Sequence, residues 1–364
     1  MEDLQYWLAA IRIPNLGAIM LRNIYEHFGS MEKFWKSAAH EISRIEGIDK
    51  RLYKNILKYR KTIDPKKELE KVQKSGIRVI TYNSGDYPKN LRNIYDAPVL
   101  IYIKGKLLPE DNLAVAVVGS RKATSYGKHV AYRLAGELAS CGITIVSGMA
   151  NGIDSWAHKG ALKAGGRTIA VMGNGVDYLY PKTNKDLYYE IMKSGAIVSE
   201  FPPGTLPHPS NFPKRNRIIS GLSLGVVVVE AAQKSGALIT ADFALEQGRE
   251  VFAVPGNITS LYSRGTNELI KQGAKLVEHV EDVLNELQLW CKIDKKAGNP
   301  KQDEEISLSR EEKKILNLIS YQATLIDYIV IKSGLPANKV NSILTALEIK
   351  GKIKQIPGGS FIRV

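Results

Sequence analysis

The spacing of apolar and polar positions changes twice along the chain. Within residues 1–62, apolar side chains such as Leu4, Leu8 and Ile11 recur at helical spacing and are interrupted by a Pro-Asn-Leu-Gly turn. A second pair of apolar segments flanks a turn at Gly47. The pattern predicts a helical domain of two helix–hairpin–helix-like units. Their turns either offer N–H groups to a phosphate or serve only for packing.

Between residues 63 and 289, short apolar runs alternate with amphipathic spacers of helix length. Two strand-like segments, Ile77–Tyr82 and Val99–Lys104, come first. The runs that follow are Val115–Gly119, Ile143–Gly148, Thr168–Gly173, Ala196–Ser199, Val226–Val229, Val251–Val254 and Lys275–Val277. This alternation predicts an α/β domain built on a doubly wound parallel sheet.

The end of the chain has a different composition. Residues 290–307 are polar and predict a linker. Residues 308–364 contain three apolar-periodic segments and two short strand-like ones, which together predict a winged helix. The expected recognition helix, Pro336–Lys350, offers few side chains that could read bases. Those candidates are Asn338, Lys339 and Asn341, and whether this domain contacts DNA or protein stays open.

Composition adds a charge argument. The 364 residues carry 51 basic and 37 acidic side chains, a formal net charge of +14, which favours a polyanionic partner but also suits a merely soluble basic protein. The two cysteines, Cys141 and Cys291, cannot form a disulfide framework, and no Cys/His cluster has zinc spacing. We therefore expect a cytoplasmic protein without a metal or cofactor. No apolar run is long enough to span a membrane.

The most informative stretch precedes the run Val226–Val229. There Phe212 stands beside Lys214, Arg215 and Arg217 in what reads as a proline-bracketed loop. Ligands of open α/β sheets gather at the carboxyl ends of the strands. Cations around one ring suit a polyanion with flat bases, such as single-stranded nucleic acid. The alternative is that the ring anchors the loop in the core.

Turns after other strands point to the same edge. Gly119-Ser120-Arg121-Lys122 lacks the Gly-x-Gly-x-x-Gly fingerprint of dinucleotide sites, yet it places cations beside a helix N-terminus. The small residues from Ser147 to Asp154 imply a close approach of the backbone to another group. We expect Asp154 to cap the next helix, and Ser147 and Asn151 are secondary ligand candidates. Ser235-Gly236 opens a further helix, which is another anion-ready terminus.

These strings resemble one family in order and spacing. Gly119-Ser120-Arg121, the Ser147–Asp154 turn, Tyr180-Pro181, Phe212–Leu222 and Ser235–Ala241 are similar to the core motifs of the DprA/Smf family of bacterial DNA-processing proteins. The resemblance covers nearly the whole chain. It implies an extended Rossmann-like domain that forms a homodimer. It also implies a non-enzymatic protein that protects incoming single-stranded DNA and loads RecA onto it during natural transformation.

The resemblance and the turn chemistry together give the expected site. The candidate DNA contacts are Gly119, Ser120, Arg121, Lys122, Ser147, Asn151, Lys182, Phe212, Lys214, Arg215, Asn216, Arg217, Ser235 and Gly236. The family's dimer and RecA surface would fall near Glu268–Val277, with Leu269, Ile270 and Leu276 as its apolar residues. An open sheet edge with apolar groups invites pairing, although the same side chains could fill the monomer's own core.

Two other functions compete with this interpretation. Nucleotide phosphoribohydrolases with a similar sheet carry Pro-Gly-Gly-x-Gly-Thr beside a catalytic glutamate, whereas Glu230 is here followed by Ala-Ala-Gln-Lys-Ser-Gly and has no evident partner acid. A regulator that reads duplex DNA through the winged helix is the other alternative. The sparse recognition helix argues against it.

Overall fold

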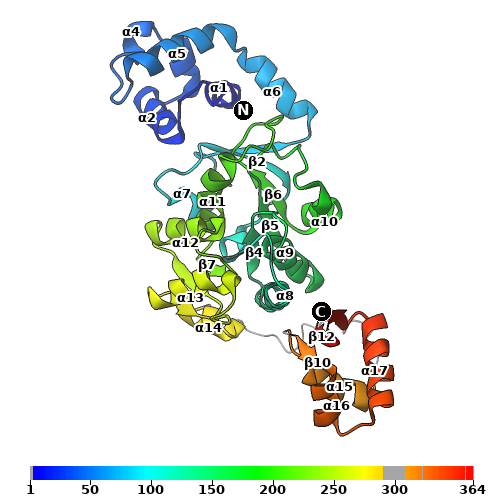
Figure 1. The fold of residues 1–364 in the computed structure, drawn as a ribbon. Helices are drawn as coiled ribbons and strands as arrows, with labels where there is room; N and C mark the ends of the chain where they lie inside the picture. Colours follow the sequence, from blue (N-terminus) through cyan, green and yellow to red (C-terminus); the bar gives the residue numbers. More distant parts are fainter. Residues whose placement is uncertain (1–2, 290–307, 322, 357, 364) are drawn as a thin grey trace.

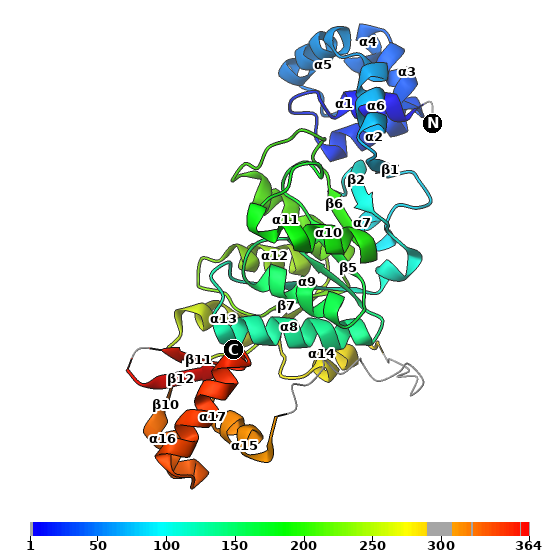
Figure 2. The same cartoon turned by 90° about the vertical axis from the view of Figure 1, so that its right-hand side faces the viewer.

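The computed structural model describes residues 3–289, 308–321, 323–356 and 358–363, and the expected linker 290–307, with Cys291, lies outside them. Figures 1 and 2 show three parts in chain order. A helical region sits at one end, a large sheet flanked by helices lies in the middle, and a small winged-helix region lies at the other end. The predicted fold class is confirmed.

The N-terminal region is entirely helical. Its helices are α1 (Leu4–Ala10), α2 (Ala18–Phe28), α3 (Met31–Lys36), α4 (Ala39–Ile42), α5 (Lys50–Thr62) and α6 (Pro65–Lys74). Trp7, Ile24, Phe34 and Ile56 form its buried core, which continues onto one face of the sheet at Tyr102. Helix α6 packs against α1, so the helical region extends past the boundary expected at residue 62.

All nine predicted strands are present in one sheet. They are β1 (Arg78–Thr81), β2 (Leu100–Gly105), β3 (Ala114–Val118), β4 (Thr144–Ser147), β5 (Thr168–Val171), β6 (Ala196–Ser199), β7 (Gly225–Val228), β8 (Glu250–Ala253) and β9 (Lys275–Leu276). Their order is β1-β2-β6-β5-β4-β3-β7-β8-β9. The strands from β6 to β9 are parallel, whereas β2 is antiparallel to both β1 and β6. The sheet is therefore a parallel one extended by an antiparallel edge.

Alternate residues of each strand face opposite layers of helices. In β3, Val115 and Val117 pack on the layer formed by α8 (Ser125–Ser140), α9 (Ile153–Lys163) and α14 (Val280–Glu286). Val118 faces the opposite layer. That layer contains α7 (Lys89–Arg92), α11 (Asn211–Leu222), α12 (Gly236–Glu246) and α13 (Arg264–Lys271). Helix α10 (Lys185–Ser194) continues the first layer beside β6. Burial on both faces explains why these strands read as continuous apolar runs.

Short 3₁₀ turns complete the large region at η1 (Pro109–Asn112), η2 (Lys182–Asn184) and η3 (Leu261–Ser263). The C-terminal region has the predicted winged-helix content. It contains α15 (Arg310–Leu318), β10 (Thr324–Leu325), α16 (Ile326–Ser333), α17 (Ala337–Ile349), β11 (Ile353–Ile356) and β12 (Ser360–Arg363), with strand order β10-β12-β11. Helix α17 is the expected recognition helix, and its Lys339 forms an ion pair with Glu311 of the same region.

Candidate functional site

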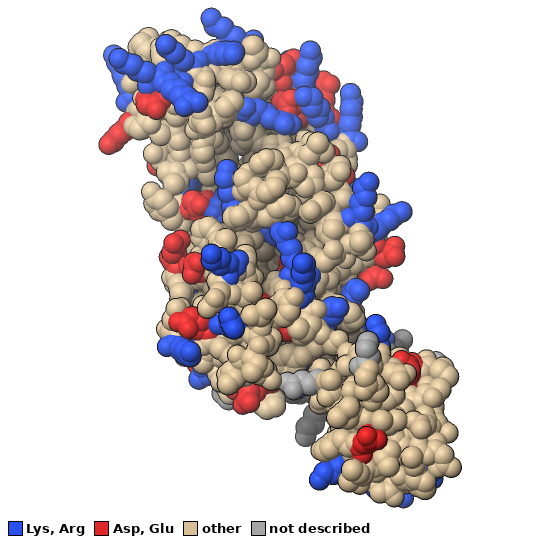
Figure 3. Space-filling model, in the orientation of Figure 1, with Lys and Arg blue, Asp and Glu red and all other residues tan. Residues whose placement is uncertain are grey.

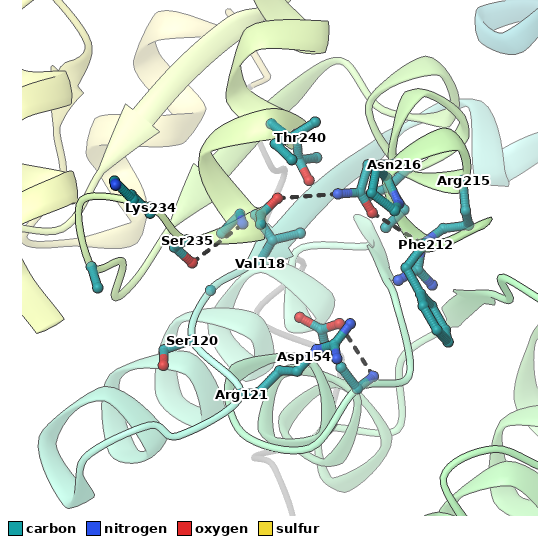
Figure 4. Close-up of a pocket in the computed structure, with 18 of the residues that line it drawn as sticks. Val118, Ser120, Arg121, Asp154, Phe212, Arg215, Asn216, Lys234, Ser235 and Thr240 are labelled. Atoms are coloured by element: carbon teal, nitrogen blue, oxygen red, sulfur yellow. Dashed lines mark hydrogen bonds between the residues drawn. The ribbon is translucent and has the colours of Figure 1, made fainter. Parts of the chain in front are cut away.

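A cleft of about 560 Å³ lies at the carboxyl ends of β3 and β7 (Figure 4). Its walls come from the turns after these two strands and from the first turns of α11 and α12. Nine of the predicted contacts line it, namely Gly119, Ser120, Arg121, Lys122, Phe212, Arg215, Asn216, Ser235 and Gly236. Segments more than 100 residues apart in the sequence thus meet at the edge where the parallel sheet places its ligands.

The turn after β3 is held rigidly by backbone contacts. The Ser120 N–H donates to the Glu230 carbonyl at 2.8 Å, and the Ser120 carbonyl accepts from the Ile153 N–H at 3.1 Å. Gly152, with φ of +84°, lies so close to this turn that a Cβ would clash with the Ser120 carbonyl oxygen. The small residues between Ser147 and Asp154 predicted a close approach of the backbone to another group. That group is the turn after β3, so the approach is between two turns of the protein itself. Arg121 and Lys122 project from this fixed loop.

An aromatic ring and a guanidinium lie together at the cleft. The Arg121 Cζ sits 5.2 Å from the centroid of the Phe212 ring, and the Tyr180 ring centroid lies 5.7 Å from that of Phe212. Gly173 lies directly against the ring, since a Cβ there would come within 2.7 Å of Phe212 Cδ1. Phe212 belongs to the first turn of α11 and not to a loop, so the loop interpretation of this segment is wrong. The ring is half-buried, which leaves part of it accessible to a ligand.

The N-terminus of α12 forms the opposite wall. The Ser235 hydroxyl caps this helix by accepting from the Ala237 N–H at 3.3 Å. The Asn216 side-chain N–H₂ donates to the Gly236 carbonyl at 3.1 Å and thereby joins α11 to α12. Gly236 has open space where a Cβ would stand. Lys234, just before the cap, adds a cation to a terminus whose dipole already favours anions.

Arg215 lies at the base of the cleft rather than at its surface. It is 5% exposed, and its Nη1 donates to the carbonyls of Gly148, at 2.8 Å, and Val171. Burial lowers the pKa of Arg215 to about 10, and nearby Asp154 opposes that shift. Its charge contributes to the potential of the cleft, but much of its hydrogen-bonding capacity is used by the protein.

Asp154 is buried beside this arginine. Burial raises the pKa of Asp154, while Arg215 and the Ala150 N–H, which donates to its Oδ2 at 3.2 Å, lower it. The N-cap residue of α9 is Gly152, so the capping role expected for Asp154 is wrong. A Cβ on Gly148 would lie 2.6 Å from the Asp154 carboxylate and 2.7 Å from the Arg215 guanidinium, which explains a glycine between them.

A smaller cavity of about 260 Å³ adjoins the cleft and shares Arg121, Phe212 and Arg215 with it. Asn151 lines this second cavity, and its Oδ1 accepts from the Thr183 hydroxyl at 2.9 Å. Lys182 is exposed on η2, next to Pro181 of the cavity wall. It does not line either cavity itself.

Three further candidates lie elsewhere. Ser147 is fully buried and donates to the Val117 carbonyl at 2.6 Å, so it serves the sheet. Lys214 and Arg217 line a different cavity, of about 680 Å³, which faces the helical region. Arg217 is buried there and forms ion pairs with Glu200 and with Asp96, the latter at 3.0 Å. These two cations therefore do not join Arg121 in the cleft.

Glu230, the lone carboxylate considered for catalysis, has a structural partner. It is 2% exposed and accepts from both the hydroxyl and the N–H of Thr124, the latter at 2.9 Å. The Thr124 hydroxyl in turn accepts from the Gly127 N–H and caps α8. Burial raises the pKa of Glu230, and the Thr124 hydrogen bonds oppose this shift. Glu230 thus anchors the start of α8.

The expected dimer residues differ in accessibility. Leu269 is 7% exposed and belongs to the monomer's own core, and Ile270 packs against that core. Leu276, on the edge strand β9, is 38% exposed. Of the three residues, only Leu276 presents a substantial apolar surface to a partner. Leu269 fills the monomer's own core, which was the alternative to a role in the dimer.

No group of three or more His, Cys, Asp or Glu side chains among the described residues could hold a metal ion. No helix in the same residues is both long and apolar enough to cross a membrane.

Comparison with known proteins decides the family. The sequence model of DNA recombination-mediator protein A matches residues 78–288. The chain belongs to this family. A model of the DprA winged helix domain also matches residues 299–359. Both matches confirm the resemblance predicted from the motifs.

Individual relatives agree with this assignment. Protein Smf of Escherichia coli is 37% identical over 99% of this chain and 96% of its own length. The solved structure of DNA processing protein A from Streptococcus pneumoniae superposes with a TM-score of 0.70 at 38% identity, over 78% of this chain and 97% of that one. The solved structure of DNA processing protein A from Helicobacter pylori is described for its single-stranded DNA binding mode. It superposes with a TM-score of 0.53 at 33% identity, over 58% of this chain and 95% of that one.

Two residues that line the cleft, Lys234 and Tyr180, were not predicted from the sequence. Lys234 was not predicted, although its position directly before the helix-opening Ser235-Gly236 was the available signal. Tyr180 was not among the predicted contacts, because a tyrosine before a proline usually serves packing, yet it is 39% exposed beside Phe212. Both lie where two turns converge, which local sequence does not reveal.

Proposed function

We propose that this protein binds single-stranded DNA in the cleft, with little dependence on base sequence. The observation that carries the proposal is the pairing of Arg121 with the half-buried Phe212 ring, opposite the N-terminus of α12. Cations and helix-terminal N–H groups bind phosphates, and an accessible ring stacks on any base. The single-stranded DNA binding mode described for the Helicobacter pylori relative supports it.

The parts of the cleft have separate roles in this proposal. Arg121, Lys122 and Lys234 neutralise the sugar–phosphate path, while Ser235 and Gly236 offer backbone at the dipole-favoured end of α12. Phe212 stacks on one base and Tyr180 extends that platform. Buried Arg215 fixes the base of the cleft through the Gly148 and Val171 carbonyls.

The test compares Arg121→Ala with wild type on matched single-stranded and duplex oligonucleotides across a salt series. If Arg121 contacts one phosphate, the slope of log affinity against log salt falls by about 0.7 for the single strand. Lys193→Ala, an exposed lysine on α10, is the matched control and should leave the slope unchanged. Equal wild-type affinity for strand and duplex, or an unchanged slope for Arg121→Ala, would contradict the proposal.

We propose further that the bound strand is protected and passed to RecA in the cytoplasm during transformation and recombination, without catalysis by this protein. The motif resemblance supports this step. The test measures RecA filament growth on single-stranded DNA with wild type and with Arg121→Ala. Growth that is stimulated equally by both would refute a hand-over from this cleft.

A further inference from the structure

The exposed face of helix α5 is an unusually basic surface far from the cleft. Helix α5 carries six basic residues and no acidic one. Five of them are exposed, namely Lys50, Arg51, Lys54, Lys58 and Lys61. The sixth, Arg60, is half-buried and anchors α5 by donating to the backbone carbonyls of Trp35 and Ser37. We call the five exposed residues the α5 basic face.

The spacing of these cations is regular. Lys50, Lys54 and Lys58 are four residues apart, so they lie in one row along the helix, with a rise of about 6 Å between neighbours. Within the described residues, none of the α5 basic face forms an ion pair, and Lys58 has only the ring of adjacent Tyr59 at 5.7 Å. Like charges at this spacing repel, which makes the row mildly unfavourable for the helix itself.

Several other surface helices of the same chain combine cations with acids. Some of their cations pair with an acid three or four residues away, as Lys36 does with Glu32 on α3 and Lys271 with Glu268 on α13. Similar pairs occur on α6 and α8. Residues 43–62 hold seven basic and two acidic residues, an excess of five within a chain whose excess is 14. One of these acids, Asp49, accepts from the Leu52 N–H as the N-cap of α5.

The helical region lacks the groups that a protein or lipid partner would need. Among residues 3–94, every large hydrophobic side chain is buried or only partly exposed, and Tyr95, which is 82% exposed, lies outside the helical region. The cores of protein interfaces are enriched in aromatic residues and Met, and interfacial membrane helices bury an apolar face. A row of unpaired cations without such anchors matches a phosphate backbone, which is bound through charge alone.

Figure 3 shows Lys and Arg side chains gathered over the end of the molecule where Figure 1 places α4 and α5. No residue of α5 lines the cleft. We propose that the α5 basic face is a second contact surface for the nucleic-acid backbone, which holds DNA that extends beyond the cleft. This inference rests on the proposed function, because the cleft supplies the strand whose continuation reaches α5. The phosphates would belong either to the same single strand or to a duplex that adjoins it.

The experiment uses the full chain with Lys50, Lys54 and Lys58 each changed to Gln. Three probes are compared: the shortest single strand that still binds wild type at full affinity, a longer single strand, and the short strand joined to a duplex. The expected result is unchanged affinity for the short probe. With three lost phosphate contacts, the salt slope should fall by about 2 if the longer single strand responds, or by about 2.7 if the duplex of the junction responds. Which of these two probes responds identifies the source of the phosphates.

A matched control changes three exposed lysines on the large region, Lys106, Lys159 and Lys193, to Gln and should affect no probe. The α5 variant should melt no lower than wild type, because it relieves repulsion between like charges. Equal weakening on all three probes would mean general electrostatic attraction, and no weakening on any would mean a solvated face; either result overturns the proposal. Arg121→Ala tests the cleft separately, since it should weaken the short probe that the α5 variant leaves unchanged.

Discussion

The Phe212→Ala substitution separates base stacking from simple charge attraction. The ring is half-buried, with Gly173 against it, the Arg121 guanidinium over it at 5.2 Å and the Tyr180 ring at 5.7 Å. Phe212 lines both the cleft and the adjoining cavity, where its ring is available to one base. Loss of one base–aromatic stack costs about 1–3 kcal/mol, which is roughly a 5- to 150-fold loss of single-strand affinity.

The salt dependence should distinguish this loss from the loss of a cation. Because Phe212 carries no charge, the slope of log affinity against log salt should match that of wild type. Arg121→Ala should instead lower the slope by about 0.7. Thermal stability should change little in Phe212→Ala, since a half-buried ring at a cleft contributes less to the core than a fully buried one.

The assay is fluorescence anisotropy of a labelled single strand over a salt series, with thermal unfolding of each variant measured alongside. Phe212→Trp should preserve affinity, because it keeps a ring at this position. Tyr189→Ala is the matched aromatic control, since Tyr189 is 51% exposed on α10 and does not line the cleft. A melting temperature lowered by several degrees with unchanged affinity would show that Phe212 is a core anchor and refute the stacking argument.

Three further outcomes follow from buried or edge groups. Burial lowers the pKa of His158 from 6.5 to about 3, so the unfolded chain binds more protons between these values. The free energy of unfolding should therefore fall as pH drops from 6.5 towards 3, by up to about 1.4 kcal/mol per pH unit. Denaturant titrations of His158→Gln at several pH values should show a shallower fall than those of wild type. Arg217→Gln should lower the free energy of unfolding by about 3 kcal/mol, because Glu200 loses its partner, and single-strand affinity at low temperature should be unchanged. Normal stability with weakened binding would instead place Arg217 on the DNA path. Leu276→Arg should give a folded monomer in sedimentation runs if the β9 edge forms the dimer, and an unchanged mass would exclude that edge.

The sequence by itself determined the order and type of the elements. Short apolar runs between amphipathic spacers predicted all nine strands of the sheet. The signal was clearest for β3, β4, β5, β6 and β7, because strands buried on both faces must be apolar throughout. The turns that end β3 and β7 could also be placed at one edge, since parallel strands bring their carboxyl ends together. Nine of the fourteen expected contacts therefore line the cleft. The antiparallel attachment of β2 was not predicted, because strand direction depends on the pairing partner.

Only the tertiary structure decided which cations face the cleft. Arg215 and Arg217 are two positions apart in the sequence. In an α-helix, that spacing rotates one side chain by about 200° from the other, so the two point to opposite sides of the helix. Arg215 therefore reaches the cleft base, whereas Arg217 points to the helical region and pairs with Glu200. Charge and spacing were visible in the sequence. The partner that neutralises each charge was not, because it comes from segments distant in the chain that only folding brings into contact.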